Sequence, residues 1–309
     1  MKKVLQLAII LLFSMRVNAQ QDLQFSQYMF DHVIVNPGYA GSLEYTQSTL
    51  IHRSQWVGWK GAPETNSLTL HGPIDQKNIG VGFNLSNDRI GVTNRTDLNL
   101  IFAYHLKLNE KLKLGLGMQG GASYYAYKNS DLVYWDQTDK VYSDGNQTNL
   151  LPNFGTGAFL YSDKYYIGIS CPHVLDYNTG DEFSINNKNK NMPRETKHYF
   201  AEAGYVFNLN SEIAIKPSVL MKYVNNSPAE ADINANVFFR QTFGLGVSYR
   251  TNDAVVALAE LQLSKRIRIG YSYDFTTTEI SNYSSGSHEI MIGYDMGIRL
   301  LKIKSPRYF

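Results

Sequence analysis

Beyond residue 19 the chain has no apolar run of about 18 residues or more, the length that a helix needs to span a bilayer. Its mean hydropathy is only −0.29. These two features exclude membrane-spanning helices. They do not exclude a membrane-spanning β-barrel, in which only every second residue of a strand has to be apolar.

Cysteine, metal-ligand clusters and catalytic motifs are also scarce. The single cysteine, Cys171, excludes an internal disulfide and a cysteine-based zinc site. The 7 histidines lack the spacing of a metal site, and no Gly-x-Ser-x-Gly elbow occurs. One Gly-x-Gly-x-x-Gly run lies at Gly115, Gly117 and Gly120, but a strand pattern follows it where a dinucleotide site needs a helix. We therefore predict no catalytic, cofactor-binding or metal-binding residues.

The N-terminus has the features of a secretory signal peptide. Lys2 and Lys3 precede an apolar stretch over 4–13, and a small-residue cleavage site ends at Ala19. Removing residues 1–19 takes three basic residues from 29 and leaves 26 against 27 acidic ones. The near-neutral exported chain therefore gives no indication of a nucleic-acid partner.

The rest of the chain alternates apolar and polar residues along many short segments. The last segment, for example, alternates Ile290 and Ile292 with Glu289 and Asp295. Such alternation over about ten residues is typical of strands whose apolar face contacts lipid. About 14 such segments fit into residues 44–309. We predict an all-β fold, a transmembrane antiparallel up-and-down β-barrel of about 14 strands in the cell outer membrane.

The connections between these segments alternate between short and long, as periplasmic turns and external loops do. We expect long external loops at 57–64, 87–95, 127–149, 176–195, 224–230 and 276–287, with 251–253 as a short exception. An even number of strands places both ends of the barrel at the periplasmic side. Residues 20–43 then form an N-terminal segment, which either plugs the lumen or lies beneath the barrel.

Several inward-facing positions carry charge or glycine. We expect luminal charges at Glu202, Glu289, Asp295, Arg266 and Arg268, and luminal glycines in the pairs Gly80/Gly82, Gly115/Gly117, Gly155/Gly157 and Gly244/Gly246. The charges suit a solvated lumen, and the glycines leave room inside it.

Two segments are not explained by strand patterning. They are Gln24-Phe-Ser-Gln-Tyr-Met-Phe-Asp-His-Val-Ile-Val-Asn-Pro-Gly-Tyr-Ala-Gly-Ser42 and Arg53-Ser-Gln-Trp-Val-Gly-Trp-Lys-Gly-Ala-Pro-Glu-Thr65. Taken alone, they indicate a packed N-terminal plug and an interfacial aromatic girdle. With the signal peptide and the C-terminal Lys304-Ser-Pro-Arg-Tyr-Phe309, they closely resemble the PorP/SprF family of Bacteroidetes outer-membrane proteins. The sequence departs from the family pattern at Asp31, where asparagine is usual, and at Gly38, where alanine is usual.

The resemblance implies a non-enzymatic role in the type IX secretion system, a system associated with gliding motility. Several family members help a large adhesin reach or stay on the cell surface. The implied partners are type IX secretion components, an adhesin-like secreted protein and outer-membrane lipid. Two other functions stay open: an outer-membrane diffusion channel, and a membrane-embedded hydrolase built from inward-facing His198, Glu202 or Glu289.

Aromatic residues beside charges suit protein recognition. We expect the partner-binding residues to include Arg53, Trp56 and Trp59 of the second segment, and Tyr134 and Trp135 of the loop 127–149. We assign barrel assembly to the C-terminal pair Tyr308 and Phe309.

Overall fold

The computed structural model describes residues 22–74, 77–128, 146–177, 184–185, 195–225 and 227–297. Within these ranges, no helix is both long and apolar enough to cross a membrane. Tyr308 and Phe309 lie outside the described residues, as do Tyr134 and Trp135.

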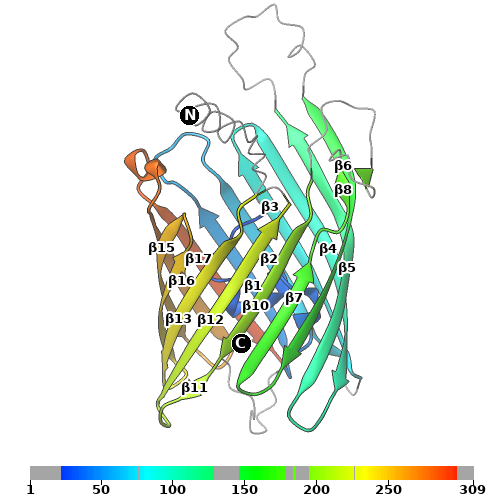
Figure 1. Ribbon diagram of the computed structural model, residues 1–309, viewed down its shortest axis with the longest axis vertical. Helices are drawn as coiled ribbons and strands as arrows, with labels where there is room; N and C mark the ends of the chain where they lie inside the picture. The colour runs from blue at the N-terminus through cyan, green and yellow to red at the C-terminus, as the bar shows by residue number, and fades with distance from the viewer. Residues whose placement is uncertain are drawn as a thin grey trace, which may run out of the picture.

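The strands form one closed antiparallel sheet (Figure 1). Their bounds are β1 Thr46–Ser54, β2 Glu64–Ile74, β3 Ile79–Ile90, β4 Thr93–Lys107, β5 Lys113–Tyr127, β6 Gln147–Tyr161, β7 Tyr165–Cys171, β10 His198–Tyr205, β11 Phe207–Asn208, β12 Ile213–Val224, β13 Glu230–Phe239, β14 Phe243–Arg250, β15 Ala254–Gln262, β16 Ile267–Thr276 and β17 Ser287–Met296. A separate pair, β8 Asp176–Tyr177 and β9 Ser184–Ile185, is parallel.

Pairing between β1 and β17 closes the ring. Both β10 and β11 pair with β12, so they form one barrel strand that is interrupted at Val206. Counted in this way, the described strands make a 14-strand barrel. The predicted fold class and strand number are confirmed.

Alternate side chains of each strand face outward and inward. On β4, for instance, Leu100 is 67% exposed on the outer surface and Ile101 is 3% exposed on the inner one. Many inward-facing residues are polar, including Gln47, Thr49 and Asn99. This arrangement is the reverse of a soluble domain, as expected for a barrel whose outer face contacts lipid.

One predicted loop is wrong. The segment 87–95 is a continuation of β3 and β4, which are joined by a tight turn at Gly91, where φ is +57°. Its polar outward-facing residues, such as Asn87 and Asn94, resemble a loop in sequence. In the structure they extend the two strands beyond the apolar belt.

The two ends of the barrel differ in their connections. Turns such as 162–164 and 240–242 lie at one end, and the connections 55–63, 172–197 and 277–286 lie at the other. Long loops of outer-membrane barrels face the exterior, so we call the second end external. Its loop 277–286 contains the 3-10 helix η6 Glu279–Asn282.

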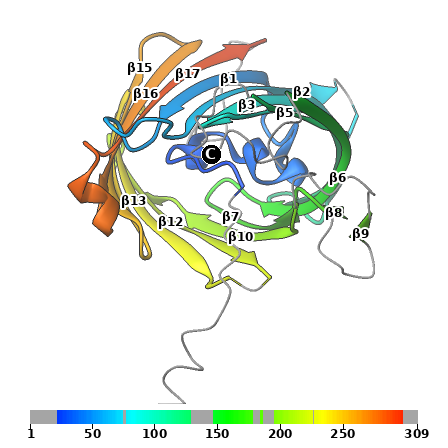
Figure 2. The same ribbon diagram turned by 90° about the horizontal axis from the view of Figure 1, so that it is seen from above.

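The N-terminal segment lies inside the lumen, where Figure 2 shows it in dark blue within the ring of strands. It contains three 3-10 helices, η1 Tyr28–Phe30, η2 His32–Ile34 and η3 Pro37–Tyr39. The alternative position beneath the barrel does not apply to residues 22–43.

This segment runs the full height of the barrel. At the external end, the Asp22 backbone N–H donates to His198 Nε2 over 3.2 Å, and Gln24 Nε2 donates to Asp253 Oδ2 over 3.3 Å. At the other end the chain turns into β1, whose first residue, Thr46, pairs with Met296 of β17. Both ends of the barrel wall therefore lie at the short-turn side, as predicted, whereas Asp22 lies at the external side.

Apolar side chains of the segment form a core with the barrel wall. Phe25, Tyr28, Met29 and Phe30 pack with wall residues that include Ile51, Leu220, Phe238, Val256 and Met291. Full burial of one large apolar side chain contributes roughly 1.5–3 kcal/mol. The hydrophobic effect thus holds the segment in a lumen that is otherwise largely polar.

Candidate functional site

The principal polar site is an ionic cluster, formed by Arg53, Arg250, Asp274 and Glu289, that surrounds Ser26 of the N-terminal segment. Arg53 Nη2 lies 2.8 Å from Asp274 Oδ2, and Arg53 Nη1 lies 3.3 Å from Glu289 Oε2. Arg250 Nη1 lies 3.0 Å from the same Asp274 oxygen. The four charges come from strands β1, β14, β16 and β17, so the cluster ties together both sides of the β1–β17 seam.

The ionic cluster binds the segment through backbone and side-chain groups. The N–H groups of Ser26 and Gln27 each donate to the Glu289 carboxylate over 2.8 Å. The Ser26 hydroxyl donates to Asp274 over 2.9 Å and accepts from Arg53 Nη1 over 2.9 Å. A buried charge is costly unless it is paired and hydrogen-bonded, and here the segment supplies part of that pairing.

A second luminal group lies near the middle of the barrel. His32 Nδ1 is 2.6 Å from Glu202 Oε2, and Asn36 Nδ2 donates to Glu202 Oε1 over 3.2 Å. Lys216 Nζ donates to the Met29 carbonyl over 2.9 Å. Glu202 therefore engages two residues of the N-terminal segment.

Luminal glycines form a seat for the backbone of residues 36–41. A Cβ atom added to Gly117 would lie 2.3 Å from the Gly38 nitrogen, and one added to Gly115 would lie 2.2 Å from the Gly38 oxygen. At Gly80 it would lie 1.9 Å from the Ala40 oxygen, well inside any real Cβ contact. The glycine seat, comprising Gly80, Gly115, Gly117 and Gly157, admits the segment because these residues have no side chains.

A buried ion pair holds the start of the segment at the external mouth. His173 Nδ1 lies 3.0 Å from Asp22 Oδ2. Burial raises the pKa of the Asp22 carboxyl, but the His173 imidazole lowers it further, so the net pKa lies below the usual range. Burial lowers the pKa of His173, and the Asp22 carboxylate raises it more, so its net pKa is raised. The two shifts have the sign of a charged pair in the folded state.

The external rim carries a fixed aromatic group. Trp59 is 47% exposed and Tyr283 is 72% exposed, with their ring centroids 6.1 Å apart. Their loops are joined because Val57 N–H donates to the Gly286 carbonyl over 2.9 Å and Ser285 N–H donates to the Val57 carbonyl over 2.7 Å. Exposed aromatics on a backbone that is already ordered suit protein recognition, since little entropy is lost on binding.

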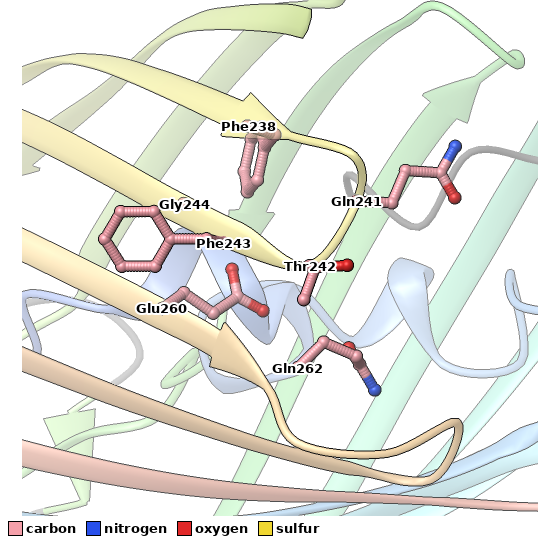
Figure 3. A pocket seen from close by; sticks show the side chains of 7 residues that line it. All are labelled: Phe238, Gln241, Thr242, Phe243, Gly244, Glu260 and Gln262. Carbon is pink, nitrogen blue, oxygen red and sulfur yellow. The ribbon is translucent and has the colours of Figure 1, made fainter. Parts of the chain in front are cut away.

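Two of the cavities among the described residues are small. One, of about 30 Å³, lies between the N-terminal segment and the wall near Asn84, Asp97 and His173. The other, of about 20 Å³, lies at the short-turn end beside the β13–β14 turn and Glu260 (Figure 3). Each has room for one or two water molecules, whereas ligand pockets measure several hundred Å³. Among the described residues, no three potential metal ligands are grouped in a way that could hold an ion.

The predicted site residues have different positions. Arg53 is only 2% exposed and binds the N-terminal segment, so its proposed contact with an external partner stays a prediction. Trp56 is partly exposed in the rim, where its φ is +44°, and Trp59 contributes to the exposed aromatic pair. The luminal charges Glu202, Glu289, Asp295 and Arg268 are buried as expected, but Arg266 is wrong, because it is exposed in the β15–β16 turn.

Two important residues were not singled out from the sequence. Arg250 continues the inward alternation of β14, and Ser26 lies within the first unexplained segment. Alternation could have placed Arg250 in the lumen. It could not have shown that Ser26, 224 positions away, accepts a hydrogen bond from it over 3.2 Å.

Solved structures confirm the barrel fold. The CymD monoaromatic hydrocarbon channel is 13% identical, with a TM-score of 0.54 over 88% of this chain and 92% of that one. A Pseudomonas aeruginosa FadL homologue is 12% identical, with a TM-score of 0.44 over 85% and 93% of the two chains. The KdgM porin is 9% identical, with a TM-score of 0.35 over 81% and 99%.

Identities at this level show the fold alone. Among curated proteins, none matches the chain at a significant level. The family described as "Type IX secretion system membrane protein PorP/SprF" matches residues 17–294, which cover almost the whole chain. The protein is therefore an outer-membrane β-barrel of the PorP/SprF family of the type IX secretion system.

Proposed function

We propose that this protein is a closed, non-enzymatic barrel that helps the type IX secretion system export a large adhesin-like protein or hold it on the cell surface. Membership of the family implies interaction with secretion components. The observation that carries the proposal is the filled lumen. Residues 22–43 occupy it from end to end and are held by buried ion pairs and by the glycine seat.

A diffusion channel is the main alternative function. It would need the N-terminal segment to leave the lumen, because the described cavities beside it hold no more than one or two water molecules. Removing the segment would leave the charges of Arg53, Asp274 and Glu289 without the hydrogen bonds of Ser26 and Gln27. That cost supports a closed resting state.

A hydrolase is less well supported. His198, Glu202 and Glu289, the inward residues that a hydrolase would use, all bind the N-terminal segment. None of the three is left facing an open pocket of ligand size among the described residues. Their role in our proposal is to retain the segment.

The external rim is our candidate surface for the secreted partner. Trp59 and Tyr283 present apolar area on ordered loops, and Val57 beside them is also exposed. Large aromatic side chains commonly supply most of the binding energy of a protein interface, about 2 kcal/mol or more each. Trp56 belongs to the same surface, whereas Tyr134 and Trp135 are further candidates by sequence.

The test is purification of the full-length protein from native outer membranes in mild detergent, followed by identification of what co-purifies. We expect type IX secretion components and one large surface protein. The double variant Trp59→Ala/Tyr283→Ala should retain at least about tenfold less of the surface protein, as expected from the loss of two aromatic contacts.

The matched control is Leu209→Ala, which removes an exposed apolar side chain at the opposite, short-turn end. It should leave recovery of the surface protein unchanged. Recovery of neither a secretion component nor a large surface protein with the wild-type chain would contradict the proposal.

A further inference from the structure

The outward face of the barrel differs around its external end. On the side formed by β12–β16, outward-facing residues are apolar or aromatic up to the loops, and include Tyr223, Ile233, Tyr249, Val255 and Phe275. On β1–β4 the outward face becomes polar before the strands end. This polar region lies on paired strands and not on loops, so its side chains have fixed positions.

The strand register arranges these polar residues in rows. Leu50, Leu68, Leu85 and Leu98 are cross-strand neighbours in the apolar belt. The next outward row toward the external end is His52, Asn66, Asn87 and Thr96, and the row beyond it is Ser54, Glu64, Arg89 and Asn94. We call these eight residues the polar ladder.

The height of the polar ladder places it beside lipid headgroups. Consecutive outward residues of a strand are about 7 Å apart, so the two rows lie roughly 7 and 13 Å beyond the leucine row. The ladder is continuous with a surface that contacts lipid tails, and amide side chains cannot face hydrocarbon without a large cost. The molecules next to the ladder are therefore the polar ends of outer-leaflet lipids.

Hydrogen bonds orient the ladder side chains. His52 Nδ1 lies 2.8 Å from Asn66 Oδ1. Asn87 Nδ2 donates to Asn94 Oδ1 over 2.6 Å and to Thr96 Oγ1 over 2.9 Å. In the part of the chain that the structure describes, the Asn66 amide nitrogen and the Arg89 guanidinium have no such partner, so they remain available to a ligand.

The chemistry of the ladder favours sugar over phosphate. Six of its members are uncharged side chains or histidine, which offer both donors and acceptors, as hydroxyl groups require. Its one arginine, Arg89, is balanced by one carboxylate, Glu64, which is its cross-strand neighbour. A phosphate-binding surface would instead present an excess of cations.

We propose that the polar ladder binds the sugar headgroup of a glycolipid in the outer leaflet of the membrane. The lipid's acyl chains lie along the leucine row, and its sugar hydroxyls bond to the ladder amides. The external β3–β4 extension, unexpected from the sequence, supplies half of this surface. The inference does not rest on the proposed role in secretion, because it concerns a different face of the barrel.

The test titrates the full-length protein in mild detergent with a lipopolysaccharide of short sugar chain or with phosphatidylethanolamine, and follows its melting temperature. We expect the glycolipid to stabilise the wild-type protein at concentrations at least about tenfold lower than the phospholipid. The variant Asn66→Leu/Asn87→Leu, which extends the apolar belt, should weaken glycolipid binding by about tenfold.

The control is Tyr223→Leu/Tyr249→Leu, two outward-facing changes at the external end of the opposite wall. It should bind the glycolipid as the wild-type protein does. Equal stabilisation by both lipids, or an unchanged ladder variant, would overturn the proposal. So would a ladder variant that keeps glycolipid binding but loses a co-purifying membrane protein, since the surface would then belong to that protein. The wild-type comparison decides the matter even where the leucine variant fails to fold.

Discussion

Ser26 lies among four buried charged side chains, and Arg53 shows most clearly what they do. Its guanidinium contacts the Ser26 hydroxyl, Asp274 and Glu289 at once. The arginine was predicted as a partner-binding residue, yet its position gives it a role in retaining the N-terminal segment. A planar group with several donors suits this role better than lysine would.

We predict that Arg53→Ala destabilises the seated N-terminal segment by about 3–5 kcal/mol, because Asp274 and Glu289 would be left buried with less compensation. Limited proteolysis of the purified protein should then cut within residues 22–43, which the wild-type fold protects. The control is Arg240→Ala. Arg240 is paired with Glu212 over 2.7 Å, but the two side chains are 73% and 55% exposed, so its loss should cost no more than about 1 kcal/mol. Equal protection in all three proteins would contradict the prediction.

Asp31 gives the N-terminal segment a dependence on pH. Burial raises the pKa of its carboxyl to about 6, although the Thr69 hydroxyl lowers it in part. The folded state therefore holds this proton more tightly than the unfolded chain does. The contribution of Asp31 to stability falls as pH rises from about 4 through 6 and is constant above that range.

We expect Asp31→Asn, which introduces the residue usual in the family, to remove this loss. At pH 8 the variant should be more stable than the wild-type protein by up to about 3 kcal/mol, and the difference should shrink toward pH 4. Thermal unfolding in detergent across that range measures it. A difference between the two proteins that does not change with pH would show that ionisation of Asp31 is not the cause.

At the scale of elements, β5 presents different glycines to its two sides. Gly117 faces the N-terminal segment, where an added Cβ would lie 2.3 Å from the Gly38 nitrogen. Gly120 faces outward, where the nearest atom to an added Cβ, in the Phe154 ring, is 3.4 Å away. The same substitution at two positions of one strand therefore separates seating of the segment from folding of the barrel.

We predict that Gly117→Ala displaces residues 36–41, because two backbones cannot move apart without loss of the surrounding hydrogen bonds. Gly120→Ala should leave the segment in place. Hydrogen exchange of residues 36–41 should become at least about tenfold faster in the first variant only, a loss of protection of about 1.4 kcal/mol or more. Similar exchange in both variants would contradict the glycine seat.

The sequence predicted the elements well where one rule governs them. Alternation of Ile290 with Glu289 is enough to predict a wall strand, because lipid and lumen differ in polarity. The same rule failed at Asn87 and Asn94, which face outward above the membrane and therefore look like a loop. The position of residues 22–43 could not be predicted either, since contacts such as Ser26 with Asp274 join residues 248 positions apart.

At the scale of the whole molecule, the filled lumen predicts low conductance. In a planar bilayer the full-length protein should show no steady large conductance, whereas a mature chain lacking residues 22–43 should show it, since the polar lumen wall would then face water. The control is the wild-type protein purified in parallel and of equal fold by circular dichroism. A large steady conductance of the full-length protein would favour a diffusion channel.

The reach of Glu289 across the seam has a consequence for biogenesis. Glu289 pairs with Arg53 across the β1–β17 ladder and also accepts the backbone N–H groups of Ser26 and Gln27. The strand that is synthesised last thus completes the binding site of the first folded segment, so zipping of the cylinder and docking of its stopper are one cooperative step. A chain that stalls before β17 keeps its amino-terminal motif undocked, and periplasmic proteases can distinguish it from the finished product.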